Sequence, residues 1–346
     1  MQRNAADGLF TKSSKFFGFK INSSYWKNLL ANNTNTISIG TRGSALALCQ
    51  AEWVKTQLTE RYPQFDFKLE KIKTTGDKIH DVPLAQVGGK GLFVKEIEEA
   101  LIENKIDIAV HSLKDVPTFL PHNLFLSVIP ERENPMDALI SREGKRLEEL
   151  PAQARLGTSS LRRQAQLLNL RPDFKIEALR GNLDTRIKKL ESKTLDGIII
   201  AAAGVIRMGW KEKITQYLDA EKFLPAIGQG ALGIETRRDD RTTNEIIAFL
   251  HHPETACCVS AERSFLKKLE GGCQVPIAAF GKIANEKLIL EGLISSFDGK
   301  KIIRDTIKGN PEEAEKTGLL LAEKLLHDGG NILLEEIYHT TGQSGH

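Results

Sequence analysis

The sequence predicts an α/β fold with parallel sheets covered by helices on both faces, followed by a smaller α+β domain. From Thr36 to about residue 203, short β-branched apolar runs alternate with segments of helical period. Strands joined through helices in this way run parallel in one sheet. After about residue 250 the order changes to a helix, two strand-like runs and a final helix. The length of 346 residues suggests two or three domains.

The first half of the chain contains five predicted elements after an extension. Residues 1–35 have no sustained apolar period and predict a disordered extension; few acidic and several basic residues leave an organellar transit segment open. Strands are predicted at 37–39, 65–72 and 106–110, and helices at 45–58, with Ser44 as its N-cap, and 93–101. The short strand at 106–110 runs into His111, Ser112, Lys114 and Asp115. Open α/β sheets bind ligands at such strand ends.

The second half repeats the strand and helix pattern. Residues 130–135, bounded by two prolines, predict a crossing segment. Beyond it we expect strands at 155–157, 174–179 and 197–203, and helices beginning at Leu161 and Leu183, the first with Leu161, Ala165 and Leu168 on one face. Residues 225–235 predict a hinge or return crossing. A helix at 259–269, strands at 287–294 and 300–307, and a helix near 312–327 complete the chain.

Composition excludes several classes of protein. The net charge of +3 is too small to indicate nucleic-acid binding, and no window approaches the length of a membrane span. The four cysteines are irregularly spaced and no secretory signal is apparent, which favours a reducing, cytoplasmic compartment. His251, His252, Cys257 and Cys258 fit no zinc spacing, so we expect no metal and a helix with two buried thiols.

Two glycine-rich stretches give no nucleotide site. Residues 228–233 match the dinucleotide fingerprint formally, but they follow no clear strand and open no helix. Residues 88–91 lack the spacing and the final Lys-Ser/Thr of a P-loop. A nucleotide-dependent enzyme is therefore disfavoured.

Basic and polar residues follow five predicted strands. In an open α/β fold these positions share one edge of the sheet, where helix N-termini also favour anions. Six arginines on one edge predict a ligand with several carboxylates. Asp115 should stay ionised among these cations and could accept a proton or stabilise a developing cation. The residues are Arg42, Ser44, Lys114, Asp115, Ser160, Arg162, Arg163, Arg180, Arg186 and Arg207.

Cys273 follows two glycines that would let its thiol approach another group closely. It could be a nucleophile or a tethering point, or simply a small buried residue. The sequence pattern alone leaves these alternatives open.

Together these motifs closely resemble the porphobilinogen deaminase (hydroxymethylbilane synthase) family, in one register from about residue 36 to about 340. The matching segments are 41–44, 87–93, 111–117, 157–163, 179–182 with Arg186, 203–204 with Arg207, 225–230 and 270–276. The resemblance implies two doubly wound α/β domains that face a cleft, like periplasmic binding proteins, and a third, α+β domain with the cysteine loop. The implied ranges are 36–132 with 229–249, 133–228, and 250–346.

The resemblance also implies an activity and a cofactor. A dipyrromethane would be bound covalently to Cys273 through a thioether. Porphobilinogen units would be deaminated and joined stepwise to this primer, and the linear tetrapyrrole hydroxymethylbilane would be released in haem biosynthesis. We expect a cytoplasmic monomer with a small-molecule substrate, without nucleic-acid or membrane partners.

The resemblance assigns roles that agree with the chemistry of the residues. Each pyrrole carries an acetate and a propionate, so a growing chain needs many cations, and loss of ammonia leaves a cationic azafulvene that a carboxylate would stabilise. Asp115 is expected to be catalytic. The cofactor would contact Lys114, Asp115, Ser160, Arg162, Arg163, Arg180 and Arg186. The substrate would contact Arg42, Ser44, Arg180, Arg186, Arg207 and Gln229, with Lys90 and Phe93 in a loop over the cleft. The alternative is a non-catalytic polycarboxylate-binding protein on the same two-lobed scaffold, which would need neither Asp115 nor Cys273.

Overall fold

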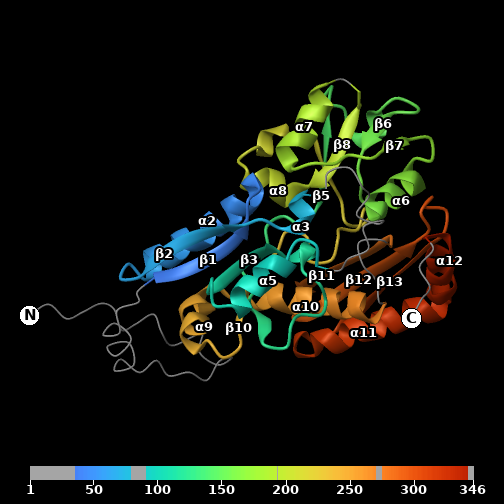
Figure 1. Cartoon of the computed structure of the whole chain (residues 1–346). Helices are drawn as coiled ribbons and strands as arrows, with labels where there is room; N and C mark the ends of the chain where they lie inside the picture. The colour runs from blue at the N-terminus through green and yellow to red at the C-terminus, as the bar shows by residue number, and fades with distance from the viewer. Residues whose placement is uncertain (1–35, 79–90, 193, 270–274, 342–346) are drawn as a thin grey trace, which may run out of the picture.

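The computed structural model describes residues 36–78, 91–192, 194–269 and 275–341, and within these ranges the chain forms three sheets (Figure 1). Two are five-stranded and lie in separate α/β lobes. The third is three-stranded and belongs to the C-terminal part. This arrangement confirms the predicted fold class.

The first lobe has the strand order β2-β1-β3-β10-β4. Its elements are β1 (Thr36–Arg42), α2 (Ala45–Arg61), β2 (Asp66–Ile72), α3 (Thr75–Lys78), α5 (Lys95–Ile102), β3 (Ile108–Ser112), the 3-10 turn η1 (Leu113–Asp115), β4 (Leu124–Val128), β10 (Leu232–Arg237), α9 (Arg241–Ile247) and η4 (Ala248–Leu250). Side chains of β3 pack alternately on the two faces, Ile108 and Val110 in one core and Ala109 in another. Burial on both faces explains the continuous apolar run of this strand.

The second lobe has the order β7-β6-β8-β5-β9. Its elements are β5 (Asp137–Ser141), η2 (Leu147–Glu149), β6 (Arg155–Gly157), α6 (Leu161–Leu170), β7 (Lys175–Glu177), α7 (Leu183–Glu191), β8 (Gly197–Ala201), α8 (Ala202–Arg207), η3 (Lys211–Lys213) and β9 (Gln216–Leu218). The strand predicted at 197–203 ends at Ala201, because α8 begins there. The small residue Gly204 lets α8 approach Leu46 of α2 in the first lobe.

The two lobes share one topology, in which each sheet contains the predicted parallel strands and one antiparallel strand. In each lobe the first three strands of the βαβ units are parallel, and the fourth position holds an antiparallel strand, β10 beside β3 and β5 beside β8. Each of these strands directly follows a crossing from the other lobe, at residues 129–136 and 219–231. The crossings lie side by side, since Glu133 N donates to Gly230 O at 3.2 Å. Residues 225–231 of the stretch predicted as a hinge or return crossing thus lie in a crossing between the lobes, whereas residues 232–235 already belong to β10.

The C-terminal part packs its helices on an antiparallel sheet. Its elements are α10 (Pro253–Lys268), β11 (Ile277–Ala284), β12 (Lys287–Ser295), β13 (Ile302–Gly309), η5 (Pro311–Glu313), α11 (Ala314–Leu325), η6 (Leu326–Gly330) and α12 (Asn331–Thr341). Phe265 and Leu321 join the helices to Leu290 of the sheet. β11 was not predicted, because Ala278 and Ala279 are buried on opposite faces and this removes the alternating pattern. No helix in the described ranges is long and apolar enough to cross a membrane.

Candidate functional site

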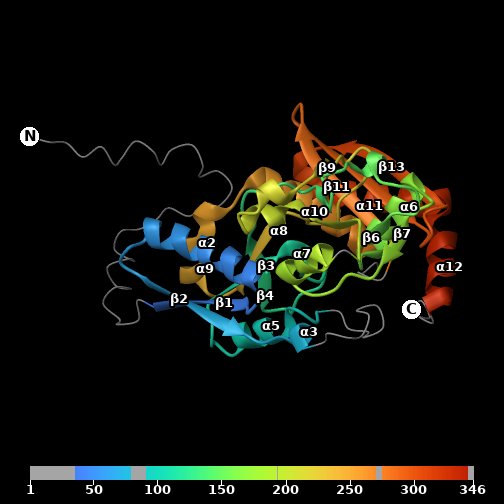
Figure 2. The same ribbon diagram turned by 90° about the horizontal axis from the view of Figure 1, so that it is seen from above.

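The strand ends of the two lobes face each other. The Cys49 thiol on α2 donates to the backbone carbonyl of Arg207 on α8 at 3.1 Å, which ties one lobe to the other. Figure 2 shows α8 beside one end of α2. The charge of Lys114, after β3, acts together with those of Arg163 and Arg186 from the second lobe. These three predicted edge residues therefore lie close enough to interact across the two lobes.

The centre of this region is the turn η1, which presents Lys114 and Asp115. The turn is anchored by the buried Leu113, whose backbone N–H donates to Ala231 O at 3.0 Å, and it is closed by Val116 N donating to Leu113 O at 3.1 Å. Gly228 lies against it with φ +68°, and a Cβ there would be 3.3 Å from Lys114 N. A glycine is therefore needed for both its conformation and its close approach.

The two charged side chains of the turn, Lys114 and Asp115, have different surroundings. Burial lowers the pKa of Lys114 to about 8, with Arg163 and Arg186 acting in the same direction and Asp115 and Asp137 opposing it. Many protein atoms surround the Lys114 ammonium, yet solvent still reaches its side chain, so it is not enclosed in a core. The half-buried Asp115 carboxylate makes no hydrogen bond or ion pair within the described part of the chain. It is available to a ligand.

Two arginines from α7 and its preceding turn complete this face. Arg186 Nε donates to Gly181 O at 2.8 Å, which orients the guanidinium. Burial lowers the pKa of Arg186, Asp115 raises it, and the neighbouring Arg180 lowers it. Lys114, Asp115, Arg180 and Arg186 thus form one electrostatic group drawn from both lobes. Ser160 is the N-cap residue of α6, but its side chain makes no capping hydrogen bond.

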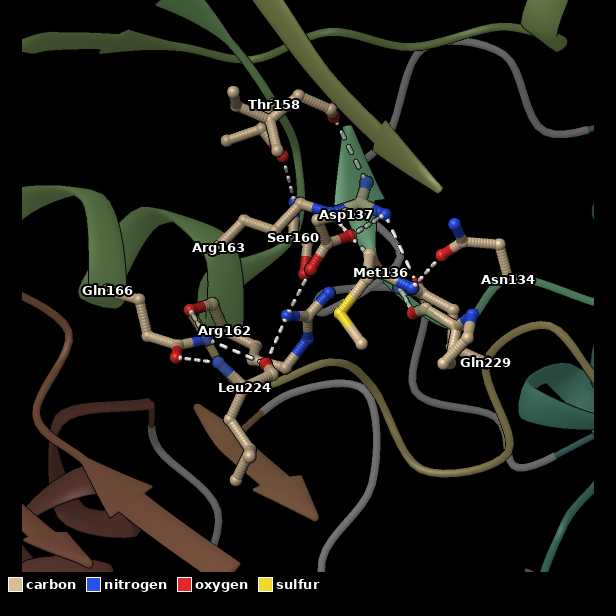
Figure 3. A network of polar contacts seen from close by, with 12 residues as sticks. Asn134, Met136, Asp137, Thr158, Ser160, Arg162, Arg163, Gln166, Leu224 and Gln229 are labelled. Atoms are coloured by element: carbon tan, nitrogen blue, oxygen red, sulfur yellow. Dashed lines mark hydrogen bonds and ion pairs between the residues drawn. The ribbon is translucent and has the colours of Figure 1, made fainter. Parts of the chain in front are cut away.

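A buried polar network lies behind this face (Figure 3). The Asp137 carboxylate, with no exposed surface, accepts from Arg162 Nη1 at 2.6 Å, Arg163 Nε at 2.7 Å and Gln229 Nε2 at 3.1 Å. Arg162 also donates to Leu224 O, and Arg163 to Ile199 O. Burial alone would raise the pKa of Asp137, but the two guanidinium charges and the hydrogen bonds lower it to about 2.

This network changes the expectation for three residues. Arg162 and Arg163 were expected to hold ligand carboxylates, and Gln229 to contact the substrate. Instead, both arginines are only 5% exposed and bind Asp137, and Gln229 is fully buried, donating to Pro135 O at 2.7 Å. The face of α6 that packs inward is also polar, so Leu161 and Leu168 are only partly buried. These groups support the face from behind, and the charge of Arg163 reaches Lys114.

The remaining predicted residues flank the inter-lobe region. The Arg42 guanidinium lies 4.2 Å from the centroid of the Phe93 ring. The Ser44 hydroxyl accepts from Ala47 N at 3.3 Å, which confirms it as the N-cap of α2. Arg207 donates to Gly230 O at 2.9 Å in the return crossing. Lys90 and Cys273 lie outside the described residues.

His111 is not part of the site, contrary to the expectation from its place before Ser112. Its side chain is buried on the face of β3 opposite to that of Ser112, and its Nε2 lies 3.0 Å from Oε2 of the fully buried Glu235. Sequence reasoning also missed Gln50, which exchanges hydrogen bonds with Ser112 at 2.9 and 3.1 Å. Glu235 could have been noticed as a single acid within an apolar strand, whereas Gln50 carries no such signal.

These observations define a class of protein: a two-lobed α/β protein whose inter-lobe face combines several cations with one available carboxylate. Such a face suits a small polyanion that undergoes chemistry through a cationic species. Comparisons with known proteins agree with this class.

Two family models cover most of the chain. Residues 37–245 match "Porphobilinogen deaminase, dipyromethane cofactor binding domain", and residues 256–327 match "Porphobilinogen deaminase, C-terminal domain". Porphobilinogen deaminase of Geobacter metallireducens is 57% identical over 302 residues, covering 87% of this chain and 95% of the relative. That of Geotalea uraniireducens is 57% identical over 303 residues, with 88% and 95% coverage. Among solved structures, the methionine-binding protein MetQ matches with TM-score 0.41 and 16% identity, over 62% of this chain and 89% of that one.

The chain belongs to the porphobilinogen deaminase family. It is accordingly a transferase, a hydroxymethylbilane synthase of tetrapyrrole biosynthesis with a dipyrromethane cofactor-binding domain. The predicted family, activity and cofactor are confirmed, and the alternative of a non-catalytic binding protein is set aside.

Proposed function

We propose that Asp115 is the catalytic carboxylate of this synthase and that the inter-lobe cations hold the carboxylates of its pyrroles. The observation that carries the proposal is the half-buried Asp115 carboxylate, without a hydrogen bond or ion pair in the described ranges, beside Lys114 of its own turn and Arg186 of the opposite lobe. The carboxylate therefore lies among cations and can still face a ligand.

The residues present fit a dipyrromethane group. Its acetates and propionates require several cations, which Lys114, Arg180 and Arg186 supply, and its pyrrole N–H groups require an acceptor, which Asp115 supplies. Cys273, in the segment outside the described residues, would carry the thioether. When bound, the cofactor supplies the free pyrrole α-carbon to which the first substrate unit is joined.

Asp115 acts on the substrate when ammonia leaves. The aminomethyl group reacts in its protonated form: the bond between its carbon and the ammonium nitrogen breaks, the nitrogen keeps the electron pair and departs as neutral ammonia, and the positive charge passes to the pyrrole. A fixed carboxylate close to that charge lowers the barrier, because its position needs no reorganisation during the reaction. Asp115 also accepts a hydrogen bond from the pyrrole N–H, whose acidity rises as the charge develops.

Arg42, Ser44 and Arg207 would hold substrate carboxylates around this centre, and Phe93 and Lys90 would belong to the covering loop. Arg42 stacks on Phe93, so a movement of Phe93 would change the position of the arginine. We assign Arg162, Arg163 and Ser160 to the cofactor side of the site. The two buried arginines would act through the Asp137 network, to which Gln229 also belongs.

Two variants test the proposal. Asp115→Asn should fold as the wild type does and lose turnover by at least about a hundredfold, the usual cost of a lost electrostatic contact at a developing charge. The exposed Asp239 provides the control, since Asp239→Asn should keep full turnover. Intact-mass measurement with peptide mapping should find a dipyrrole on the Cys273 peptide of the wild type and not in Cys273→Ser. Near-normal turnover of Asp115→Asn would refute the catalytic assignment.

We also propose three domains, at 36–132 with 229–249, 133–228, and 250–346, acting as a cytoplasmic monomer. The paired crossings at 129–136 and 219–231 support the first two boundaries. Free thiols at Cys49, Cys257 and Cys258 support a reducing compartment. All proposed contacts come from a single chain, so light scattering of the loaded enzyme should give the mass of one copy.

A further inference from the structure

Helix α10 of the C-terminal part contacts the backbone directly after the Lys114–Asp115 turn. Arg263 Nη1 donates to Val116 O at 2.9 Å, and Nη2 donates to Pro117 O at 2.6 Å. Two separate nitrogens of one planar group thus hold two consecutive carbonyls. A lysine, with a single nitrogen on a flexible chain, cannot reproduce this fork.

The carboxylate that acts electrostatically on Arg263 is Glu235 of β10, the strand beside β3. Burial lowers the pKa of Arg263 to about 10, and Glu235 opposes that effect. Arg263 therefore stays charged at neutral pH. Glu235 binds His111 through Oε2, while its buried Oε1 has no hydrogen-bond partner among the described residues. Glu235 binds His111, which precedes the turn, and Arg263 binds Val116, which follows it. Together the two charged residues restrain the chain on both sides of Asp115.

The same region of α10 also packs on the turn and on the return crossing. Val259 lies in one apolar cluster with Leu113 and Val116. Glu262, next to Arg263, accepts from Gly228 N at 2.7 Å, and Gly228 lies against Lys114 N. The turn is thus held by apolar packing from Val259, by the Gly228 crossing and by Arg263, and of these only Arg263 fixes the carbonyls that follow Asp115.

We propose that Arg263 is a positioning residue for the reaction. It fixes the Val116–Pro117 backbone so that the Asp115 carboxylate points into the inter-lobe site, and it makes that position depend on the C-terminal part of the chain. The inference rests on the proposed catalytic role of Asp115. Because Arg263 acts through the turn and binds no ligand, its loss lowers kcat more than it raises KM.

The test compares Arg263→Met and Arg263→Lys with Arg238→Lys. Arg238 is the control, an exposed arginine whose Nε donates to His122 O at 3.0 Å and which follows the end of β10 that lies away from the turn. We expect Arg263→Met to lower kcat by roughly ten- to a hundredfold, the scale of a small displacement of a catalytic group, with KM changed less than about twofold. Arg263→Lys should lower kcat by at least about threefold, and the control should match the wild type.

Two further readouts separate positioning from general damage. Hydrogen exchange should become faster at the amides of residues 113–118 in Arg263→Met and stay unchanged in β12 and β13. The fraction of protein carrying the dipyrrole, measured by intact mass, should equal that of the wild type. A loss of the loaded fraction, or a rise in KM as large as the fall in kcat, would overturn the inference.

Asp115→Asn, measured in parallel, distinguishes the two proposals. If it is inactive while both Arg263 variants keep wild-type kcat, the positioning role is wrong and the proposed function stands. If Asp115→Asn is active, the proposed function itself fails. Should Arg263→Met not fold, an unchanged kcat in Arg263→Lys alone would be enough to reject the positioning role.

Discussion

The carboxylate of Glu262 binds the guanidinium of Arg132 through two parallel hydrogen bonds, Nη1 to Oε1 at 2.6 Å and Nη2 to Oε2 at 3.1 Å. This pair joins α10 to the first crossing. Arg132 Nε donates in turn to Gln229 O in the second crossing at 2.7 Å, and Glu262 also accepts from Gly281 N of β11 at 2.9 Å. One buried carboxylate therefore connects both inter-lobe crossings to the C-terminal sheet.

We expect Arg132→Met to destabilise the protein by about 3–5 kcal/mol, because it leaves Glu262, which has no exposed surface, as an unpaired buried charge. Urea unfolding measures the change in the free energy of unfolding. The control is Glu323→Gln, which breaks the exposed ion pair between Glu323 of α11 and Lys268 of α10. This variant should cost less than about 1 kcal/mol. Equal costs for the two variants would mean that the buried pair contributes no more than a surface pair.

Asp137 predicts a loss of stability in acid. Its pKa in the folded protein is about 2, below the ordinary value of 3.8, so its contribution is complete above about pH 4 and is lost as the pH falls through about 2. The shift corresponds to about 2 kcal/mol. Unfolding free energies measured from pH 4.5 to 2 should therefore fall less steeply in Asp137→Asn than in the wild type, although the variant is less stable at pH 7. The same slope in both proteins would contradict this account.

How much the sequence revealed depended on whether a residue's partner is near it in the chain. The strand ends could be predicted, because a strand followed by a capped helix is a local pattern, and Ser44 caps α2 as expected. The direction in which a side chain points at a strand end could not be predicted. Arg162 and Arg163 follow the same junction as Ser160, yet both bind Asp137, some 25 residues earlier in the sequence.

The antiparallel strands are a second case of this limit. Nothing within β5 or β10 indicates that each inserts beside the third strand of the lobe it has just entered. Likewise, the contact of Arg263 with Val116 joins residues 147 positions apart, and no local pattern predicts it. The family resemblance supplied the activity and the cofactor, whereas the support of the Lys114–Asp115 turn by α10 came from the structure.

Lys114 predicts an alkaline limit to substrate binding. Burial lowers its pKa to about 8, so above this pH the side chain becomes neutral and no longer attracts a carboxylate. We expect kcat/KM for porphobilinogen to fall above about pH 8. In Lys114→Arg the fall should move to higher pH, because a guanidinium remains charged there. Steady-state profiles from pH 6.5 to 9.5 measure both effects, with hydrogen exchange as a check that the fold is unchanged. An identical alkaline limb in the two proteins would assign it to another group.

Alanine variants at Gly228 and Gly209 distinguish displacement of the Lys114–Asp115 turn from a general loss of stability. Gly228 and Gly209 both have positive φ, +68° and +74°, so alanine at either position should cost about 1–2 kcal/mol of strain. Only at Gly228 would the new Cβ press on the turn, 3.3 Å from Lys114 N, whereas at Gly209 no atom lies within 4 Å. Both variants should therefore lose similar stability in urea, and only Gly228→Ala should lose turnover, by about tenfold or more. If Gly209→Ala lost as much turnover as Gly228→Ala, the effect would come from lowered stability and not from the displacement of Lys114 and Asp115.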